Sequence, residues 1–173
     1  MKTRFFAVVT LGALAISLTG CPKKAQVKEE PATPEDSQKA QSVDEPSLRG
    51  KEYQQVPDLV TIYFDLDQST LRNDARQTLQ KNYQALKQHA DWEVLIEGNC
   101  DERGTTEYNL GLGQRRAAAV RAYYISLGIS GTRVATISYG KEKGVCEQHS
   151  EDCWSQNRRA DTKARVNPEK SSK

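Results

Sequence analysis

Histidine and long apolar segments are both scarce in this chain, and their scarcity excludes several classes of function. The 173 residues include two histidines, His89 and His149, and apolar residues make up 36% of the chain. The sequence shows no Ser-His, Cys-His or histidine-rich metal constellation, so an enzymatic role is not expected. The apolar share is below the usual globular share, which indicates that part of the chain lies outside any core.

The chain also lacks an excess of charge of either sign. It has 25 Lys and Arg residues against 23 Asp and Glu residues. Without Lys2 and Arg4, which belong to the N-terminal segment described next, the numbers become 23 and 23. Binding to nucleic acid relies on many basic side chains that neutralise phosphates, so we expect no nucleic acid partner.

The first 20 residues have the pattern of a secretory signal peptide. A basic start precedes a mainly apolar run from Phe5 to Leu18, which is too short to cross a bilayer as a helix of the mature protein. The run ends in Leu18-Thr-Gly-Cys21, which resembles the lipobox of bacterial lipoproteins, whose cysteine becomes the lipid-modified first residue. The alternative is an ordinary signal peptide with an incidental cysteine.

The residue after Cys21 bears on the membrane that the lipid would enter. Pro22 stands there, and not the aspartate that would resemble an inner-membrane retention signal. We therefore expect an outer-membrane protein whose folded domain faces the periplasm. Several acyl chains on Cys21, at roughly 0.8 kcal/mol for each buried CH₂, would give stable anchoring.

Residues 21–56 have the composition of a tether. Pro22, Pro31, Pro34 and Pro46 interrupt a stretch that is rich in Lys, Glu, Gln, Ser and Asp and has hardly any large apolar residue. Such a segment cannot bury enough apolar surface to offset the entropy of ordering, so we expect it to be disordered. We expect the folded domain over residues 57–167 and a disordered tail over 168–173.

Strand and helix patterns alternate from residue 57 onward. Apolar and β-branched runs predict strands over 59–64, 92–97 and 134–139, and alternation predicts a fourth over 160–166. Apolar residues at helical spacing predict helices over 71–86 and 108–127, with a short helix around 154–159. The order βαβαβ-αβ predicts an α+β fold in which helices pack on one mixed four-stranded sheet.

Lipidation of Cys21 would leave three cysteines in the mature chain. Cys146 and Cys153 lie in a polar loop, and the periplasm is oxidising, so we expect a disulfide between them. The alternative is a metal site that also uses His149, but that set leaves the fourth ligand unnamed. Cys100 is then left over, and a buried small apolar role suits it best.

Residues 98–117 contain a carboxylate and a guanidinium that suit one ligand. Asp101 follows an apolar strand, and Arg116 lies on the next helix, whose long side chains lean back toward the helix N-terminus. Together they fit the free end of an amino acid, with Arg116 on its carboxylate and Asp101 on its ammonium. A direct Asp101–Arg116 ion pair that closes the loop on the helix explains the spacing equally well.

Two glycines interrupt the same predicted helix. Gly111 and Gly113 each cost up to about 1 kcal/mol relative to alanine in a helix interior. Either another backbone packs closely against the helix at this point, or a ligand lies across a groove that a side chain would fill. The spacing favours neither explanation.

Six ordered motifs carry a resemblance to a known family. They are Ile62-Tyr-Phe-Asp-Leu-Asp67, Gly98-Asn-Cys-Asp-Glu-Arg-Gly104, Glu107-Tyr-Asn109, Gln114-Arg-Arg-Ala117, Ser138-Tyr-Gly-Lys-Glu142 and Asn157-Arg-Arg-Ala160. Over about residues 57–167 they resemble the OmpA-like C-terminal domain family. The lipobox and the tether add a resemblance to its lipid-anchored branch, the peptidoglycan-associated lipoproteins (Pal).

The resemblance implies non-covalent binding of peptidoglycan, without catalysis, cofactor or metal. The family holds the side-chain end of meso-diaminopimelate in the stem peptides. The implied contacts are the side chains of Asp101, Arg116 and Asn109, the backbone of Leu66 and Asp67, and Leu112 in the pocket wall. Replacing Asp101 or Arg116 by alanine should then abolish wall binding and leave folding cooperative. Asn157, Arg158 and Arg159 resemble a structural clamp more than ligand contacts.

The resemblance also implies partners. Lipoproteins of this kind bind TolB and belong with other Tol proteins to the Tol-Pal system, which keeps the outer membrane attached during cell division. A wall-binding lipoprotein of the same fold outside the Tol system is one alternative. A peptidoglycan hydrolase that uses two of Asp65, Asp67, Glu97 and Asp101 is another.

Overall fold

The computed structural model describes residues 45–165. The signal peptide, Cys21, the first part of the expected tether and the expected tail lie outside these residues. Within residues 45–165, no helix is both long enough and apolar enough to cross a membrane.

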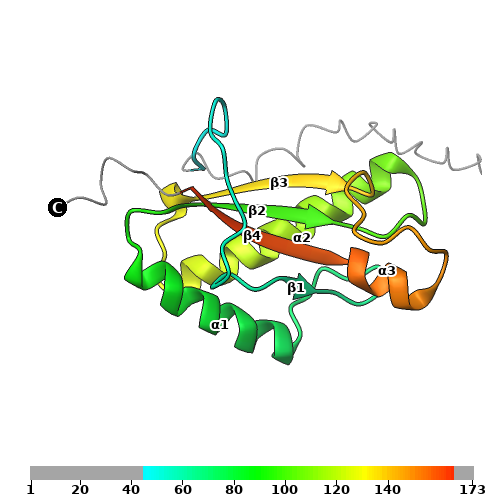
Figure 1. The fold of residues 1–173 in the computed structure, drawn as a ribbon, viewed down its shortest axis with the longest axis horizontal. Coiled ribbons are helices and arrows are strands. Elements are labelled where there is room, and N and C mark those ends of the chain that lie inside the picture. The colour runs from blue at the N-terminus through cyan, green and yellow to red at the C-terminus, as the bar shows by residue number, and fades with distance from the viewer. Residues whose placement is uncertain (1–44, 166–173) are drawn as a thin grey trace, which may run out of the picture. The chain divides into compact units, whose positions relative to one another are not determined.

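Strands and helices follow one another in the order that the sequence predicts (Figure 1). The strands are β1 (Ile62–Tyr63), β2 (Glu93–Asn99), β3 (Val134–Gly140) and β4 (Arg159–Arg165). The helices are α1 (Asn73–Gln88), α2 (Thr106–Ser126) and α3 (Glu151–Asn157), with a 3-10 turn at Gly131–Arg133.

The four strands form one mixed sheet in the order β1-β4-β2-β3. β2 and β3 run parallel, with Val94 opposite Val134, and β4 runs antiparallel to both β2 and β1. The predicted α+β fold with a mixed four-stranded sheet is therefore confirmed. Because β1 and β2 both run antiparallel to β4, they point the same way, and the loops that follow them emerge at the same edge of the sheet.

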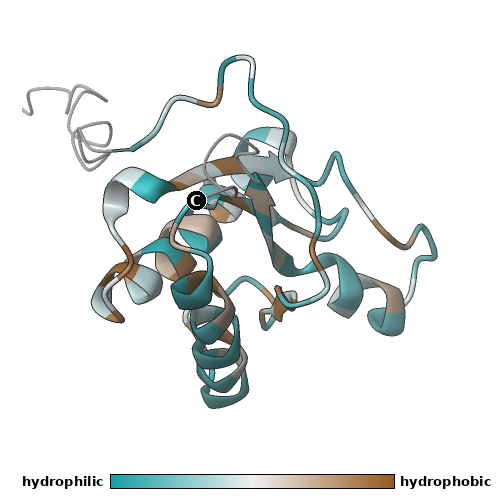
Figure 2. Ribbon diagram, turned by 60° about the vertical axis from the view of Figure 1, so that its left-hand side comes forward, coloured by the Kyte–Doolittle hydropathy of each residue, from teal (hydrophilic) through white to brown (hydrophobic). Residues whose placement is uncertain are grey.

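The core lies between the sheet and helices α1 and α2. On β4, Ala160, Thr162 and Ala164 are fully buried on the face toward the core, while Lys163 stays partly exposed. Much of the helix and loop surface is hydrophilic, as expected of helices that bury one face (Figure 2). The buried apolar cluster includes Leu59, Ile62, Phe64, Leu79, Leu86, Val94, Ile96, Val120, Tyr124 and Val134.

β1 is shorter than the strand expected over 59–64. The backbone N–H of Val60 donates to Asn82 Oδ1 at 2.9 Å, and Asn82 Nδ2 donates to the Val60 carbonyl at 2.8 Å. Asn82 on α1 is fully buried, so its amide satisfies a backbone that would otherwise need a strand partner. Ile62 and Tyr63 alone of the predicted strand pair with β4.

Contacts with the sheet begin before residue 57, where the sequence places the start of the domain. Gln54 and Ala164 exchange two backbone hydrogen bonds of 3.0 Å, which extends the pairing along β4. Lys51 Nζ lies 2.8 Å from Glu93 Oε2. The last part of the expected tether therefore lies against the domain.

The glycines of α2 have different surroundings. A Cβ on Gly113 would lie 2.9 Å from the carbonyl oxygen of Gly98, and a Cβ on Gly98 would overlap the Gly113 carbonyl. The backbones of α2 and β2 thus touch at this point, which decides the open question for Gly113 in favour of close packing. A Cβ on Gly111 would meet nothing closer than an Arg115 nitrogen at 3.5 Å.

Candidate functional site

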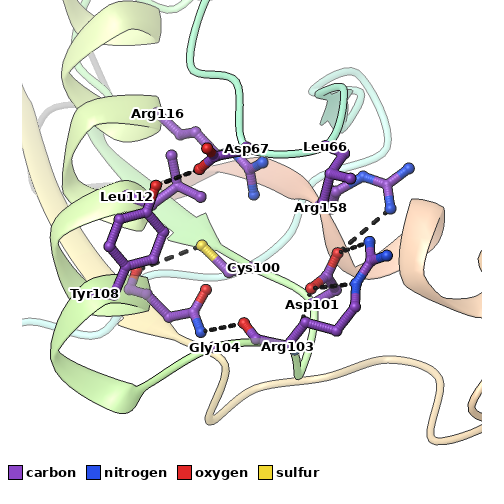
Figure 3. A pocket seen from close by; sticks show the side chains of 11 residues that line it. Leu66, Asp67, Cys100, Asp101, Arg103, Gly104, Tyr108, Leu112, Arg116 and Arg158 are labelled. Atoms are coloured by element: carbon purple, nitrogen blue, oxygen red, sulfur yellow. Dashed lines mark hydrogen bonds and ion pairs between the residues drawn. The ribbon is translucent and has the colours of Figure 1, made fainter.

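A cleft of about 220 Å³ opens where the loops after β1 and β2 meet the first turns of α2 (Figure 3). Thr105 begins α2 at this edge, because its side chain accepts a hydrogen bond from Tyr108 N. All six ligand contacts that the resemblance implies line the cleft. The lining residues are Leu66, Asp67, Cys100, Asp101, Arg103, Gly104, Tyr108, Asn109, Leu112, Arg116 and Arg158.

Arg116 is fully buried and holds the two loops to the helix. Its Nε donates to the Gln68 carbonyl at 2.8 Å, Nη1 to the Asn99 carbonyl at 2.8 Å and Nη2 to the Asp65 carbonyl at 3.1 Å. Burial lowers the pKa of Arg116. Three of its five N–H groups are used on backbone carbonyls, which leaves two for a ligand.

Asp101 is 5% exposed and contacts two other arginines. Its Oδ2 accepts from Arg103 Nη2 at 2.7 Å and from Arg158 Nη1 at 3.3 Å. Burial favours the neutral acid, but hydrogen bonds from Arg103 and Arg158 outweigh it, so the pKa of Asp101 lies below its usual range. The described residues contain no Asp101–Arg116 ion pair, so that alternative for their spacing is wrong.

The turn after β1 forms the other wall of the cleft. Gln68 N donates to the Asp65 carbonyl at 3.1 Å, and Asp67 has a φ of 57°, a left-handed conformation that aspartate tolerates better than most residues. The Tyr108 hydroxyl donates to the Asp67 carboxylate, and this bond raises the pKa of Tyr108. Among the described residues, the backbone N–H groups of Leu66 and Asp67 have no hydrogen-bond acceptor.

Asn109 and Leu112 support the cleft from the helix. Asn109 Nδ2 donates to the Arg103 carbonyl at 2.8 Å and to the Thr105 carbonyl at 3.0 Å, so it fixes the end of the loop that carries Asp101. Leu112 is 5% exposed and forms an apolar part of the wall. Leu66, in contrast, is 54% exposed at the rim.

The cleft is also lined by Arg103, Tyr108 and Arg158, which the sequence did not predict. Arg158 belongs to the motif interpreted as a clamp, and its Nε does donate to the Phe64 carbonyl at 3.2 Å, but it also reaches Asp101. The predicted ends of the strands give no distance between side chains. Only the position of Arg103, two residues after Asp101, was a signal that the two could meet.

A disulfide joins Cys146 and Cys153, the pairing that the sequence favours. Both sulfurs are used in that bond, which removes the thiolates that the metal alternative needs. His149 Nδ1 instead lies 2.5 Å from Glu102 Oε1. Cys100 is buried, and burial raises the pKa of its thiol.

Three of the carboxylates considered for a hydrolase, Asp65, Glu97 and Asp101, have basic partners, whereas Asp67 accepts from the Tyr108 hydroxyl. Asp65 Oδ1 lies 2.6 Å from Arg72 Nη1, and Glu97 Oε2 lies 2.8 Å from Lys163 Nζ. Glu97 and Lys163 line a second groove, on the face of the sheet away from the core. Of the four carboxylates, Asp67 and Asp101 line the same cleft, and each is held there by a hydrogen bond from another side chain, Tyr108 and Arg103 respectively.

Comparison with known proteins agrees with the geometry. The model of the OmpA family matches residues 63–159. A peptidoglycan-associated lipoprotein of Brucella melitensis is 54% identical over 101 residues, which cover 58% of this chain and 60% of that protein. One of Pseudomonas aeruginosa is 43% identical over 105 residues, which cover 61% of this chain and 62% of that protein. The match thus spans about 60% of the length of these relatives.

Solved structures give the same result. The peptidoglycan-associated lipoprotein of Burkholderia pseudomallei is 46% identical, with a TM-score of 0.59, over 61% of this chain and 89% of that one. The C-terminal domain of Helicobacter pylori MotB, at 14% identity and a TM-score of 0.59, shares the fold. The matched family and the names of these relatives agree with the expected non-enzymatic role. The chain belongs to the OmpA family.

Proposed function

We propose that this protein binds peptidoglycan non-covalently and holds the outer membrane to the wall. Its lipid anchor would be Cys21, its tether the residues up to about 56, and its wall-binding domain residues 57–167. The ligand would be the dipolar side-chain end of meso-diaminopimelate in the stem peptides. The names of the relatives support the wall as the target, since they are called peptidoglycan-associated lipoproteins.

One observation carries the proposal: the cleft has a carboxylate and a guanidinium that do not neutralise each other. Asp101 and Arg116 both line it, and each is held by other groups. Figure 3 shows Asp101 near Arg103 and Arg158, with Arg116 across the cleft beside Asp67. At about 220 Å³ the cleft is smaller than typical small-molecule sites of roughly 300–1,000 Å³, which suits one end of a side chain.

The ligand carboxylate would lie against the turn after β1. The N–H groups of Leu66 and Asp67, which lack an acceptor in the described part of the chain, would donate to it together with the remaining N–H groups of Arg116. The ligand ammonium would reach Asp101, and Leu112 would contact the methylene chain. This arrangement would disfavour a neutral peptide end, because such an end offers neither a carboxylate to these N–H groups nor an ammonium to Asp101.

We further propose that the partners include TolB and other Tol proteins, in the Tol-Pal system of cell division. The support is the resemblance of the ordered motifs to lipid-anchored members of the family. A lipoprotein that works outside the Tol system would bind wall equally well. Co-purification of TolB with the full-length protein from solubilised membranes distinguishes the two, because only the first proposal expects TolB in the eluate.

A pull-down of full-length protein with purified diaminopimelate-containing sacculi tests wall binding. Asp101→Asn should reduce binding by about ten- to a hundredfold, the value of a hydrogen bond to a charged group of roughly 1.5–3 kcal/mol. Glu93→Gln is the matched control. It also removes a carboxylate that is ion-paired, with Lys51, but at the opposite end of β2.

Thermal unfolding of both variants accompanies the pull-down. If Asp101→Asn binds sacculi as the unchanged protein does, or if both variants lose binding together, the cleft is not the wall site. Release of soluble muropeptides during the incubation would support the hydrolase alternative instead.

A further inference from the structure

We infer that Arg103 occupies, on Asp101, the position that the ligand ammonium takes, and that on ligand binding Arg103 gives up Asp101 and is held by Trp154 and Glu151 alone. The inference rests on the proposed function and adds a residue that governs access to the same cleft. It makes Arg103 an internal competitor of the ligand. Four steps support it.

The first step is that Asp101 has no unused acceptor site. A carboxylate offers about four lone-pair positions. Its Oδ1 accepts from Arg103 N at 3.2 Å and from Arg103 Nε at 3.3 Å, and its Oδ2 accepts from Arg103 Nη2 and Arg158 Nη1. An ammonium that bonds to Asp101 must therefore displace one of these donors.

The second step is that Arg103 is the donor that can leave. The Arg158 side chain is 7% exposed and is held on three sides, by Asp101, by the Phe64 carbonyl and by Glu151 Oε1 at 2.5 Å. The Arg103 side chain is 34% exposed and gives two of the four hydrogen bonds on Asp101. Moving Arg103 costs less, because its guanidinium is already partly solvated.

The third step is that Arg103 already has two other contacts, which can hold it without Asp101. The guanidinium carbon of Arg103 lies 4.1 Å from the centre of the Trp154 ring, and Nη2 lies 3.7 Å from Glu151 Oε2. A cation over an indole face is a favourable contact. If Arg103 gives up Asp101, it therefore keeps the indole contact and a charge partner while Asp101 becomes accessible.

The fourth step is that the Trp154 indole is itself held in place. Trp154 Nε1 donates to Glu102 Oε1 at 2.7 Å, and the same oxygen contacts His149. Trp154 lies on α3 directly after Cys153, whose disulfide to Cys146 closes the loop that leads into the helix. The position of the indole is therefore tied to the loop that carries Asp101 and Arg103.

The exchange has a consequence for ligand selection. A ligand with a primary ammonium replaces one cation on Asp101 by another, so the charge around Asp101 is unchanged. A ligand whose amine is acylated leaves Asp101 to Arg103 and gains nothing from that side of the cleft. The cleft should therefore select chain ends that have a free amine next to a carboxylate.

Calorimetry with the full-length protein in detergent and meso-diaminopimelate as the probe tests the exchange. Arg103→Gln should bind about two- to fivefold more tightly, because a competitor of the strength of a partly exposed ion pair has been removed. Arg115→Gln is the matched control. It removes an exposed guanidinium of α2 that lies over Tyr108. This guanidinium does not contact Asp101, so affinity should stay unchanged.

A double-mutant cycle separates exchange from a purely structural role. In the protein that keeps Arg103, Trp154→Ala should weaken binding by a similar factor, since Arg103 then lacks the indole that holds it once it has given up Asp101. In the Arg103→Gln background the same change should have no effect. The indole N–H signal of Trp154 in NMR spectra should shift on ligand addition, and this shift should be absent in Arg103→Gln.

Weaker binding by Arg103→Gln, or equal effects of Trp154→Ala in both backgrounds, would overturn the exchange. Asp101→Asn in the same calorimeter shows which proposal has failed. If Asp101→Asn abolishes binding while Arg103→Gln weakens it, the proposed function stands and only the exchange is lost. If the unchanged protein does not bind the probe at all, both are refuted.

Discussion

Arg133 and Arg116 lie near opposite ends of β2, and each uses its guanidinium on the backbone of neighbouring elements. Arg133 donates to the carbonyls of Trp92 at 3.0 Å and His89 at 2.8 Å, at the end of α1 and the start of β2. Arg116 donates to three carbonyls of the loops after β1 and β2. Burial lowers the pKa of both residues, and neither makes an ion pair within residues 45–165.

The difference lies in what else each end contains. Beside Arg116 there is a cleft with Asp101 in its wall and backbone N–H groups at its rim, whereas Arg133 secures a helix end on the sheet. A buried arginine against carbonyls is thus a structural device that this fold uses twice. The proposed ligand site at the Arg116 end adds a carboxylate, Asp101, that does not pair with the buried arginine. The predictions below test this division between stability and binding.

The largest effect is expected from removing the two arginines in turn. Arg116→Ala should lower the free energy of unfolding by about 3 kcal/mol, because it removes a fully buried side chain and leaves the carbonyls of Asp65, Gln68 and Asn99 without this donor. The sequence predicts that the variant still folds cooperatively, and the burial of Arg116 adds that it should be less stable. Arg133→Ala should cost less, since Arg133 is half-buried and water can reach its partners. Urea denaturation and sacculus binding measure both, and loss of wall binding by Arg133→Ala would contradict the comparison.

The disulfide should give the next largest effect, and at the cleft end. Replacing Cys146 and Cys153 by serine removes a short covalent loop, which is worth roughly 2.5 kcal/mol in the chain-entropy model. We expect hydrogen exchange to speed up in α3 and in the loop with Asp101, and to stay slow in α1. Faster hydrogen exchange confined to α1 would show that the disulfide does not stabilise the elements around the cleft.

The two glycines of α2 offer a matched pair. Gly113→Ala should destabilise by about 1–3 kcal/mol, because its Cβ would press on the Gly98 backbone and on Ser138. Gly111→Ala should stabilise by up to about 1 kcal/mol, since its position is open and alanine is the better helix former. Denaturant midpoints of both variants check the signs, and two changes in the same direction would refute the packing explanation.

The smallest effect is expected from pH. The native pKa of Asp101 is lowered, so its ion pairs contribute stability above the unfolded pKa of about 3.9, and this is lost as pH falls through the native pKa. The stability difference between the unchanged protein and Asp101→Asn should therefore shrink as pH falls below about 4. Glu93, whose pKa is lowered chiefly by a hydrogen bond from Lys51, should behave alike at the Arg133 end. A difference that grows on acidification would contradict both assignments.

Much of the fold could be predicted because the signals are local. The helices over Asn73–Gln88 and Thr106–Ser126 follow from apolar spacing, and β2 and β3 from β-branched runs ended by glycine. β1 was overestimated because the Asn82 amide replaces strand partners for Val60, and Asn82 lies on another element. Hydrogen bonds between distant elements leave no periodic signal in either segment.

The sequence by itself determined the order of the elements, the placement of Asp101 and Arg116 at one edge of the sheet, and the two cysteines that pair. These follow from periodicity and from short spacings, which the backbone converts directly into position. Only the tertiary structure decided which charges meet: Arg116 contacts carbonyls, and Asp101 contacts Arg103 and Arg158. Ion pairs form within about 4 Å, a distance that loop conformation sets and that residue numbers do not contain.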